Sequence, residues 1–231
     1  MMIGKAVSEN YLPRPVDRSK KVLEVQGLRT AKLRGVSFDL HQGEIIGFYG
    51  LRGAGKSEIG YALYGLDAVQ AGSIRVNGRL ERFALPRDSL RKGIAMIPEE
   101  RLSEGIIPKL PIRSNISITN LRKLSTLGVV NARRERQTAE KYARLMNIKA
   151  HSIEQRAATL SGGNQQKVVV SKCLNAESRI LIMDEPTRGV DVGAKEEIHR
   201  IIRELAGQGA AIMIFSSEYP EIVNLCDRIF L

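Results

Sequence analysis

A glycine-rich segment near the start of the chain has the residue types and spacing of a phosphate-binding loop. Residues 50–57, GLRGAGKS, fit the pattern G-x-x-x-x-G-K-[ST] and lie between an apolar run and a predicted helix. In this setting backbone N–H groups and the helix N-terminus bind phosphate oxygens, Lys56 reaches the β- and γ-phosphates, and Ser57 ligates Mg²⁺. A glycine turn without a ligand is the alternative. The predicted nucleotide-contacting residues are Gly50, Leu51, Arg52, Gly53, Ala54, Gly55, Lys56, Ser57 and Glu58.

Two acids at the end of another apolar run could bind the metal ion and activate the water that hydrolyses a nucleotide bound at this loop. The segment RILIMDEP predicts a buried strand that ends at Asp184 and is followed by Glu185. A carboxylate at the carboxyl end of a strand can meet the Mg²⁺ held by Ser57, and we expect Asp184 to hold this ion through water. Glu185 would polarise the attacking water as general base. The alternative is a solvated acidic turn without a metal. The presence of the glycine loop in the same chain makes this alternative less favoured.

Residues 160–167, LSGGNQQK, predict a second helix N-terminus that can bind phosphate. A serine cap, Ser161, precedes the glycines Gly162 and Gly163. One chain cannot easily fold two anion sites onto one nucleotide, whereas a head-to-tail dimer can. We therefore expect this end of one domain to close over the γ-phosphate held by the glycine loop of another.

These segments require a mostly parallel sheet covered by helices. Strand patterns occur at residues 22–26, 36–40, 44–50, 73–76, 94–97, 179–184, 210–217 and 228–231, and helical patterns at 56–65, 132–146, 162–174, 194–206 and 220–225. Such alternation is typical of α/β domains. Residues from about 101 to 160 interrupt it with a basic helical sequence, which we interpret as an inserted subdomain. Residues 1–21 carry prolines and scattered charge and are interpreted as a linker or arm, which leaves one domain over residues 22–231.

The composition indicates a globular chain with a basic surface. Its 231 residues include 36 Lys and Arg against 25 Asp and Glu, a formal charge of 36 − 25 = +11. Such a charge suits nucleic acid or an anionic membrane surface. Cys173 and Cys226 lie far apart in apolar contexts and outside any metal-ligand or redox spacing, which indicates buried thiols in a reducing compartment. No apolar run approaches the roughly 18 residues of a membrane span.

The order of the motifs resembles that of the ATP-binding cassette (ABC) family, whose domains carry a glycine loop, a signature, an Asp-Glu strand, a D-loop aspartate and a switch histidine. The resemblance runs from about Val22 to Leu231. It implies a P-loop NTPase α/β fold with a mostly parallel sheet core, an antiparallel β region and an inserted helical subdomain. It also implies ATP and Mg²⁺ as cofactors. The further nucleotide contacts that it implies are Ser161, Gly162, Gly163, Gln165 and Asp191.

Longer matches narrow this resemblance. LSGGNQQKV and DEPTRGVDVGAK are similar to the second, C-terminal cassette of the tandem ATP-binding subunits of bacterial monosaccharide importers (the ribose, galactose, xylose, arabinose and autoinducer-2 class). Residues 2–15 are similar to the stretch that joins the two cassettes there. The resemblance implies a second cassette in the same polypeptide, transmembrane permease subunits and, indirectly, a periplasmic sugar-binding protein. It implies a location at the cytoplasmic face of the bacterial inner membrane and no nucleic acid partner.

The chain departs from the family pattern at two catalytic positions and at the position that contacts the adenine base of the nucleotide. Glu99 stands where the family has a glutamine that contacts Mg²⁺ and the transporter, and Ser217 where it has a histidine that grips the γ-phosphate. Losing one transition-state donor costs on the order of 10²–10³ in rate. We expect Glu99 and Ser217 at the catalytic site, with ATP binding retained and slow hydrolysis at this domain's own loop. Residues 28–35 offer no aromatic side chain for adenine, which leaves Tyr11 or Arg29.

Two other functions stay open. A nucleic-acid-associated cassette ATPase would use the basic charge, but the chain has neither a sustained heptad run nor a cysteine cluster. A non-hydrolysing regulatory cassette would bind ATP without turnover. In the transporter interpretation, residues 99–115 receive a short helix of the permease. We then expect Ile106, Ile107, Leu110 and Ile112 to be exposed, unless they pack under the helical subdomain.

Overall fold

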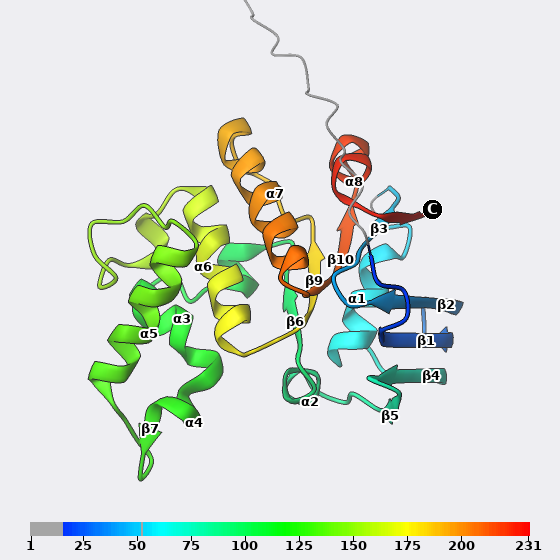
Figure 1. The fold of residues 1–231 in the computed structure, drawn as a ribbon, viewed down its shortest axis with the longest axis horizontal. Coiled ribbons are helices and arrows are strands. Elements are labelled where there is room, and N and C mark those ends of the chain that lie inside the picture. The colour runs from blue at the N-terminus through cyan, green and yellow to red at the C-terminus, as the bar shows by residue number, and fades with distance from the viewer. Residues whose placement is uncertain (1–15, 52) are drawn as a thin grey trace, which may run out of the picture.

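A five-stranded parallel sheet forms the centre of the structure, a computed structural model that describes residues 16–51 and 53–231 (Figure 1). Its order is β11-β3-β10-β9-β6, and all neighbouring pairs run parallel. The register places Ser216 beside Tyr49 and Phe215 beside Asp184, so the carboxyl ends of three strands meet at one edge. The strands are β3 (Ile45–Tyr49), β6 (Ile94–Ile97), β9 (Ile180–Asp184), β10 (Ala211–Ser216) and β11 (Arg228–Phe230).

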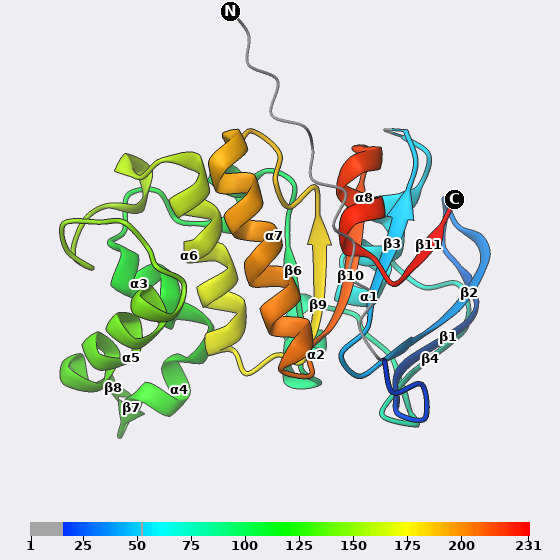
Figure 2. The same cartoon turned by 45° about the horizontal axis from the view of Figure 1, so that its top comes forward.

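Successive side chains of these strands pack into two cores on opposite faces of the sheet. Leu181 and Ile212 lie in one core that includes residues of α6, α7 and α8, whereas Ile182 and Met213 lie in the other core, which includes residues of α1. Both faces are therefore covered, which explains the continuous apolar strand sequences. Figure 2 shows α6 and α7 side by side next to the sheet. The covering helices are α1 (Lys56–Tyr64), α2 (Pro86–Arg91), α6 (Gly162–Asn175), α7 (Val192–Gly207) and α8 (Tyr219–Leu225).

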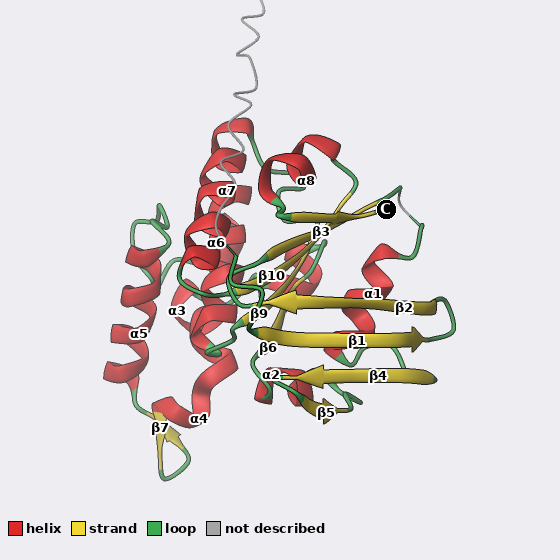
Figure 3. Cartoon of the chain, turned by 45° about the vertical axis from the view of Figure 1, so that its right-hand side comes forward, coloured by secondary structure: helices red, strands yellow, loops and turns green. Residues whose placement is uncertain are grey.

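An antiparallel sheet closes the core on the α1 side (Figure 3). Its order is β2-β1-β4-β5, with β1 at Lys21–Arg29, β2 at Arg34–His41, β4 at Ala71–Val76 and β5 at Arg79–Glu81. Phe48 of the parallel sheet stacks on Phe215 at 4.8 Å and on Phe230 at 5.0 Å between ring centroids within this core. The predicted fold class, a parallel core with an antiparallel region, is confirmed. The short strand β5 was not predicted.

Residues 101–159 form the helical region at the side of the parallel sheet. One difference from the prediction is a two-stranded hairpin, whose turn holds Leu127 and Gly128 at φ of 51° and 82°. The elements are a π-helical turn (Arg101–Gly105), α3 (Ile112–Ser117), a 3₁₀ turn (Ile118–Asn120), α4 (Leu121–Leu124), β7 (Ser125–Thr126), β8 (Val129–Val130), α5 (Ala132–Leu145) and a 3₁₀ turn (Ala157–Thr159).

The expected exposure of the isoleucines in residues 99–115 is wrong for two of them. Ile106 and Ile112 are buried in the core that includes α6, because the helical region covers them. Ile107 is 42% exposed and Leu110 is half-buried.

Several predictions concern residues that lie outside the part of the chain that the structure describes. Most of the predicted tail, residues 1–21, lies outside it, and so do Tyr11 and Arg52. Within residues 16–51 and 53–231, every helix is too short or too polar to span a bilayer.

Candidate functional site

The glycine loop joins the end of β3 to the start of α1. Gly53 and Gly55 have φ values of 82° and 89°, which L side chains rarely adopt, so the loop needs glycine at both positions. The N–H of Ala54 donates to the carbonyl of Leu51 at 3.1 Å and tightens the turn. Gly55 is the N-cap of α1, and no side chain of the described residues caps this helix end. The N–H groups of the first turn are therefore available to an anion.

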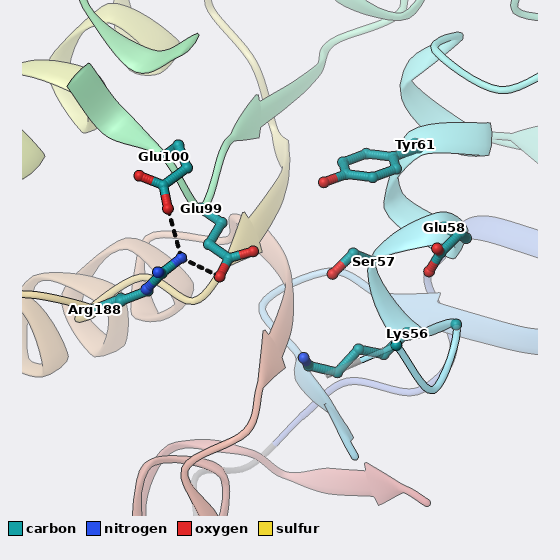
Figure 4. Close-up of a pocket in the computed structure, with 9 residues that line it drawn as sticks. Lys56, Ser57, Glu58, Tyr61, Glu99, Glu100 and Arg188 are labelled. Carbon is teal, nitrogen blue, oxygen red and sulfur yellow. Dashed lines mark hydrogen bonds and ion pairs between the residues drawn. The ribbon is translucent and has the colours of Figure 1, made fainter. Parts of the chain in front are cut away.

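A cavity of about 390 Å³ opens beside this loop (Figure 4). The α1 side chains face Glu99, Glu100 and Arg188 across it. Sequence reasoning missed Tyr61, Glu100 and Arg188 as lining residues. The predicted site residues that line the cavity are Gly53, Gly55, Lys56, Ser57, Glu58 and Glu99.

Lys56 and Glu185 form a nearly buried ion pair below the loop. The Nζ of Lys56 lies 3.1 Å from Oε1 of Glu185, and their side chains are 9% and 6% exposed. Glu185 has a left-handed φ of 46°, and its N–H donates to the carbonyl of Phe215 at 2.8 Å. The backbone N–H of Ser217 donates to Oε1 of Glu185 at 2.9 Å, and the hydroxyl of Ser216 lies 3.5 Å from Oε2. The structure thus brings Ser217 to Glu185 through its backbone.

Asp184 lies at the end of β9, directly beside Ser57. The hydroxyl of Ser57 donates to Oδ1 of Asp184 at 2.9 Å. The other oxygen, Oδ2, is buried and has no hydrogen-bond partner among the described residues. Burial, with the nearby charges of Glu99 and Glu185, raises the pKa of Asp184 to about 6 against the opposing effects of Ser57 and Lys56. A buried, unpartnered carboxylate oxygen beside a serine hydroxyl fits a divalent cation that phosphate oxygens help to bind.

Arg188 pairs with both carboxylates on one wall of the cavity. Its guanidinium pairs with the carboxylate of Glu99 and, at 2.7 Å, with that of Glu100. Arg188 follows β9 closely, and its N–H donates to the carbonyl of Glu185 at 3.1 Å. Glu58, on the opposite wall, pairs with Lys32 at 2.8 Å. The carboxylates that line the cavity are therefore engaged with cations of this chain.

The predicted second anion site lies at the N-terminus of α6. Ser161 is the N-cap of α6, but its hydroxyl accepts from the amide of Asn164 at 2.9 Å and does not cap the backbone. A Cβ on Gly163 would lie 2.6 Å from the Cβ of Ala194, so glycine allows α6 and α7 to approach. Within the described part of the chain, none of the residues 160–167 lines the cavity beside the glycine loop.

Gln165, which we expected to contact nucleotide, makes hydrogen bonds within its own chain in this structure. Its side chain is 5% exposed, donates to the carbonyl of Leu160 at 3.1 Å, and accepts from Nε of Arg101 at 3.2 Å. Arg101 also donates to the carbonyls of Arg188 at 2.6 Å and Gly189 at 3.1 Å. A Cβ on Gly162 would lie 2.8 Å from Nη2 of Arg101, so this guanidinium needs glycine beside it. Gln165 therefore connects Arg101 to the carbonyl of Leu160. Sequence reasoning missed Arg101 as the residue that joins these segments.

Other predicted residues lie near the cavity or at helix ends. Asp191 is the N-cap of α7, where its side chain accepts from the N–H of Ala194 at 2.9 Å. Leu51 is 79% exposed. Arg29, considered for adenine, is at the end of β1 and does not line the cavity.

Comparisons with known proteins agree with this geometry. The family model described as ABC transporter matches residues 33–188. The crystal structure of an ATP-binding cassette of an ABC transporter in its ADP conformation has a TM-score of 0.76 to this chain at 19% identity. The match covers 91% of this chain and 86% of that one, and it concerns the fold alone.

The chain is also similar to two proteins named for ribose import. It is 43% identical over 232 residues to the ribose import ATP-binding protein RbsA of Geobacillus kaustophilus, covering 100% of this chain and 47% of that protein. It is 44% identical over 233 residues to the ribose import ATP-binding protein RbsA 2 of Burkholderia ambifaria, covering 99% of this chain and 46% of that protein. The chain therefore spans about half the length of these relatives.

Proposed function

Because the chain belongs to the ABC transporter family, we propose that it binds Mg-ATP at the glycine loop and hydrolyses it slowly to drive the import of a monosaccharide. The sugar class rests on the relatives at 43% and 44% identity that are named for ribose import. A non-hydrolysing regulatory cassette is the second candidate, which the replacement of catalytic positions by Glu99 and Ser217 favours. Both candidate functions require ATP binding, but only the first requires that the chain hydrolyse ATP.

The contact between Ser57 and Asp184 carries the proposal. The Ser57 hydroxyl and the unpartnered Oδ2 of Asp184 lie below a loop whose N–H groups can bind phosphate. When bound, Mg²⁺ would neutralise charge on the phosphate oxygens. Lys56 would bind the β- and γ-phosphates, and Glu185, oriented by the N–H of Ser217, would accept a proton from the attacking water.

Calorimetric titration of the chain with Mg-ATP tests this assignment. We expect saturable heat and a thermal shift for the wild type, and neither for Lys56→Ala. Lys123→Ala is the matched control, because Lys123 pairs with Glu177 far from the cavity and is 61% exposed. A folded wild-type chain that gives no heat and no shift at millimolar nucleotide contradicts the proposal.

We further propose that a second cassette in the same polypeptide pairs head-to-tail with this one. The chain spans about half the length of its relatives, and its described residues 160–167 do not line its own cavity. Ser161 and Gly163 would then serve the partner's nucleotide, whereas Lys56 serves this chain's slow site. The two ATP sites of the assembly are unequal in this proposal.

Steady-state ATPase of the complete tandem protein with its permease tests this asymmetry. Replacing Ser161 should abolish most turnover, and Lys56→Ala should lower it less. Equal loss in the two variants means that the sites are equivalent or that both must be occupied.

The permease would dock on residues 99–115 at the cytoplasmic face of the bacterial inner membrane, with a periplasmic sugar-binding protein acting through it. Leu102 and Ile107 are 49% and 42% exposed there. A neighbouring cavity of about 460 Å³ is lined by Tyr61, Tyr64, Leu66, Met96, Pro98, Glu104 and Lys172. Cysteines placed at 102 and 107 should cross-link to permease loops, and transport that persists without any cross-link argues against this surface.

A further inference from the structure

The cavity beside the glycine loop is unusually rich in carboxylates for a site that is to receive a triphosphate. Glu58, Glu99 and Glu100 line it, and Asp184 and Glu185 lie at its base. The cations among the lining residues are Lys56 and Arg188. Since ATP brings further negative charge, the carboxylates must be compensated before it can bind well.

Each wall of the cavity compensates its carboxylates in a different way. Glu58 pairs with Lys32, and Glu185 pairs with Lys56. On the opposite wall, Arg188 pairs with Glu99 and with Glu100. The raised pKa of Asp184 has the charge of Glu99 among its causes, after burial, so Glu99 acts electrostatically on the base of the cavity.

Arg188 is held in place by its backbone on both sides. Its N–H donates to the carbonyl of Glu185 at 3.1 Å, and its carbonyl accepts from Arg101 at 2.6 Å. Arg101 also binds Gly189, where a positive φ of 64° sets the direction of the chain. The guanidinium therefore starts from a fixed point beside Glu99. A pair between two freely mobile surface side chains would lack this support.

We infer that Arg188 is a charge-compensating residue of the nucleotide site, which neutralises Glu99 so that the cavity accepts a nucleoside triphosphate. The inference rests on the proposed binding of Mg-ATP at the glycine loop. Removing Arg188 takes a positive charge from beside Glu99 and so makes this wall of the cavity more negative toward the phosphates. The loss of affinity should therefore depend on Glu99 and should shrink as added salt screens the cavity.

A double-mutant cycle measured by calorimetric titration with Mg-ATP tests the inference. We expect Arg188→Gln to weaken binding about tenfold in the wild-type background, which corresponds to about 1.4 kcal/mol. In the Glu99→Gln background the same change should weaken binding less than twofold, because the other partner of Arg188, Glu100, is 59% exposed and water screens its charge. Arg188→Lys, which keeps the charge, should retain most of the affinity.

Arg200→Gln is the matched control, because Arg200 is 59% exposed on α7 and pairs with Glu204 at 2.8 Å. Thermal unfolding of every variant confirms that it is folded, and Arg188→Met, which also removes the charge, replaces Arg188→Gln if the glutamine variant does not fold. An equal loss of affinity in the wild-type and Glu99→Gln backgrounds overturns the inference alone, and so does an unchanged affinity of Arg188→Gln. A wild-type chain that binds no Mg-ATP overturns the proposed function and this inference with it.

Discussion

Replacing Glu185 by Gln tests how the ion pair with Lys56 limits nucleotide binding. The two charges lie 3.1 Å apart in side chains that are 9% and 6% exposed. A glutamine keeps the size of Glu185 and can still accept from Lys56 and from the N–H of Ser217. It removes the negative charge that competes with phosphate for Lys56. We expect Glu185→Gln to bind Mg-ATP more tightly and to hydrolyse it more slowly.

The size of the gain follows from the position of Glu185 behind Lys56. We take a phosphate that contacts Lys56 to lie about 6 Å from the carboxylate, which allows roughly 3 Å for each of the two contacts of Lys56. Two unit charges at about 6 Å repel by roughly 0.7 kcal/mol in water and 2.8 kcal/mol at an effective dielectric constant of 20. A value of about 1.4 kcal/mol between these limits makes binding about tenfold tighter. The loss of a general base lowers the rate about 10²–10⁴-fold.

Calorimetric titration with Mg-ATP and with Mg-ADP measures the affinity, and phosphate release measures hydrolysis. The gain should be larger for ATP than for ADP, because ATP presents both its β- and its γ-phosphate to Lys56, whereas ADP presents its β-phosphate alone. Glu218→Gln is the control, since Glu218 pairs with Lys195 at 2.7 Å and is 47% exposed. The reasoning is refuted if Glu185→Gln binds Mg-ATP no more tightly than the wild type, or if the control gains equally.

Three further predictions concern the metal, a positioning arginine and pH. Asp184→Asn should make the affinity for ATP nearly equal with Mg²⁺ and with EDTA in calorimetric titrations, since the metal loses its carboxylate. Arg101→Ala should lower the free energy of unfolding in urea by about 1–3 kcal/mol, because it leaves two partly buried acceptors, the carbonyl of Arg188 and Oε1 of Gln165, without this donor. Burial alone raises the pKa of Glu44, but hydrogen bonds from Arg228 and His41 outweigh it and hold the pKa below the ordinary 4.5. Glu44 therefore stabilises the fold above about pH 4.5, and this stability is lost as the pH falls through the lower folded pKa. Urea unfolding of Glu44→Gln should show a smaller loss between pH 5 and pH 3 than the wild type does.

The elements that position the site were predictable because their signals are local. A buried strand, glycines at Gly53 and Gly55 and a helix that starts at Lys56 follow one another within a short stretch of chain. The strand that ends at Asp184 is equally local, since its apolar run is continuous. Parallel register then brings this strand end to the glycine loop without any further specification.

The contacts that connect these elements could not be predicted from the sequence, because they join distant residues. Arg188 pairs with Glu99 across 89 positions, and no local pattern indicates which carboxylate a given arginine will reach. Burial of Ile106 and Ile112 under the helical region was the alternative to the exposure that we expected, and the sequence could not decide between the two for a related reason. Each becomes buried only when the helical region folds over residues 99–115, which apolar character alone does not reveal.

Among the residues that the structure describes, the two cations that line the cavity are Lys56 and Arg188, and both are paired with carboxylates through one continuous set of contacts. Lys56 contacts Glu185, the carbonyl of Glu185 accepts from the N–H of Arg188, and Arg188 contacts Glu99. A phosphate that draws Lys56 away from Glu185 therefore acts on the turn that carries Arg188. Because Glu99 begins the segment that we propose docks the permease, the same exchange of ion pairs gives nucleotide binding a physical route to that surface. The route predicts that ATP changes the hydrogen-exchange protection of residues 99–105 in the wild type and changes it less in Glu185→Gln, where Lys56 has no charged partner to leave.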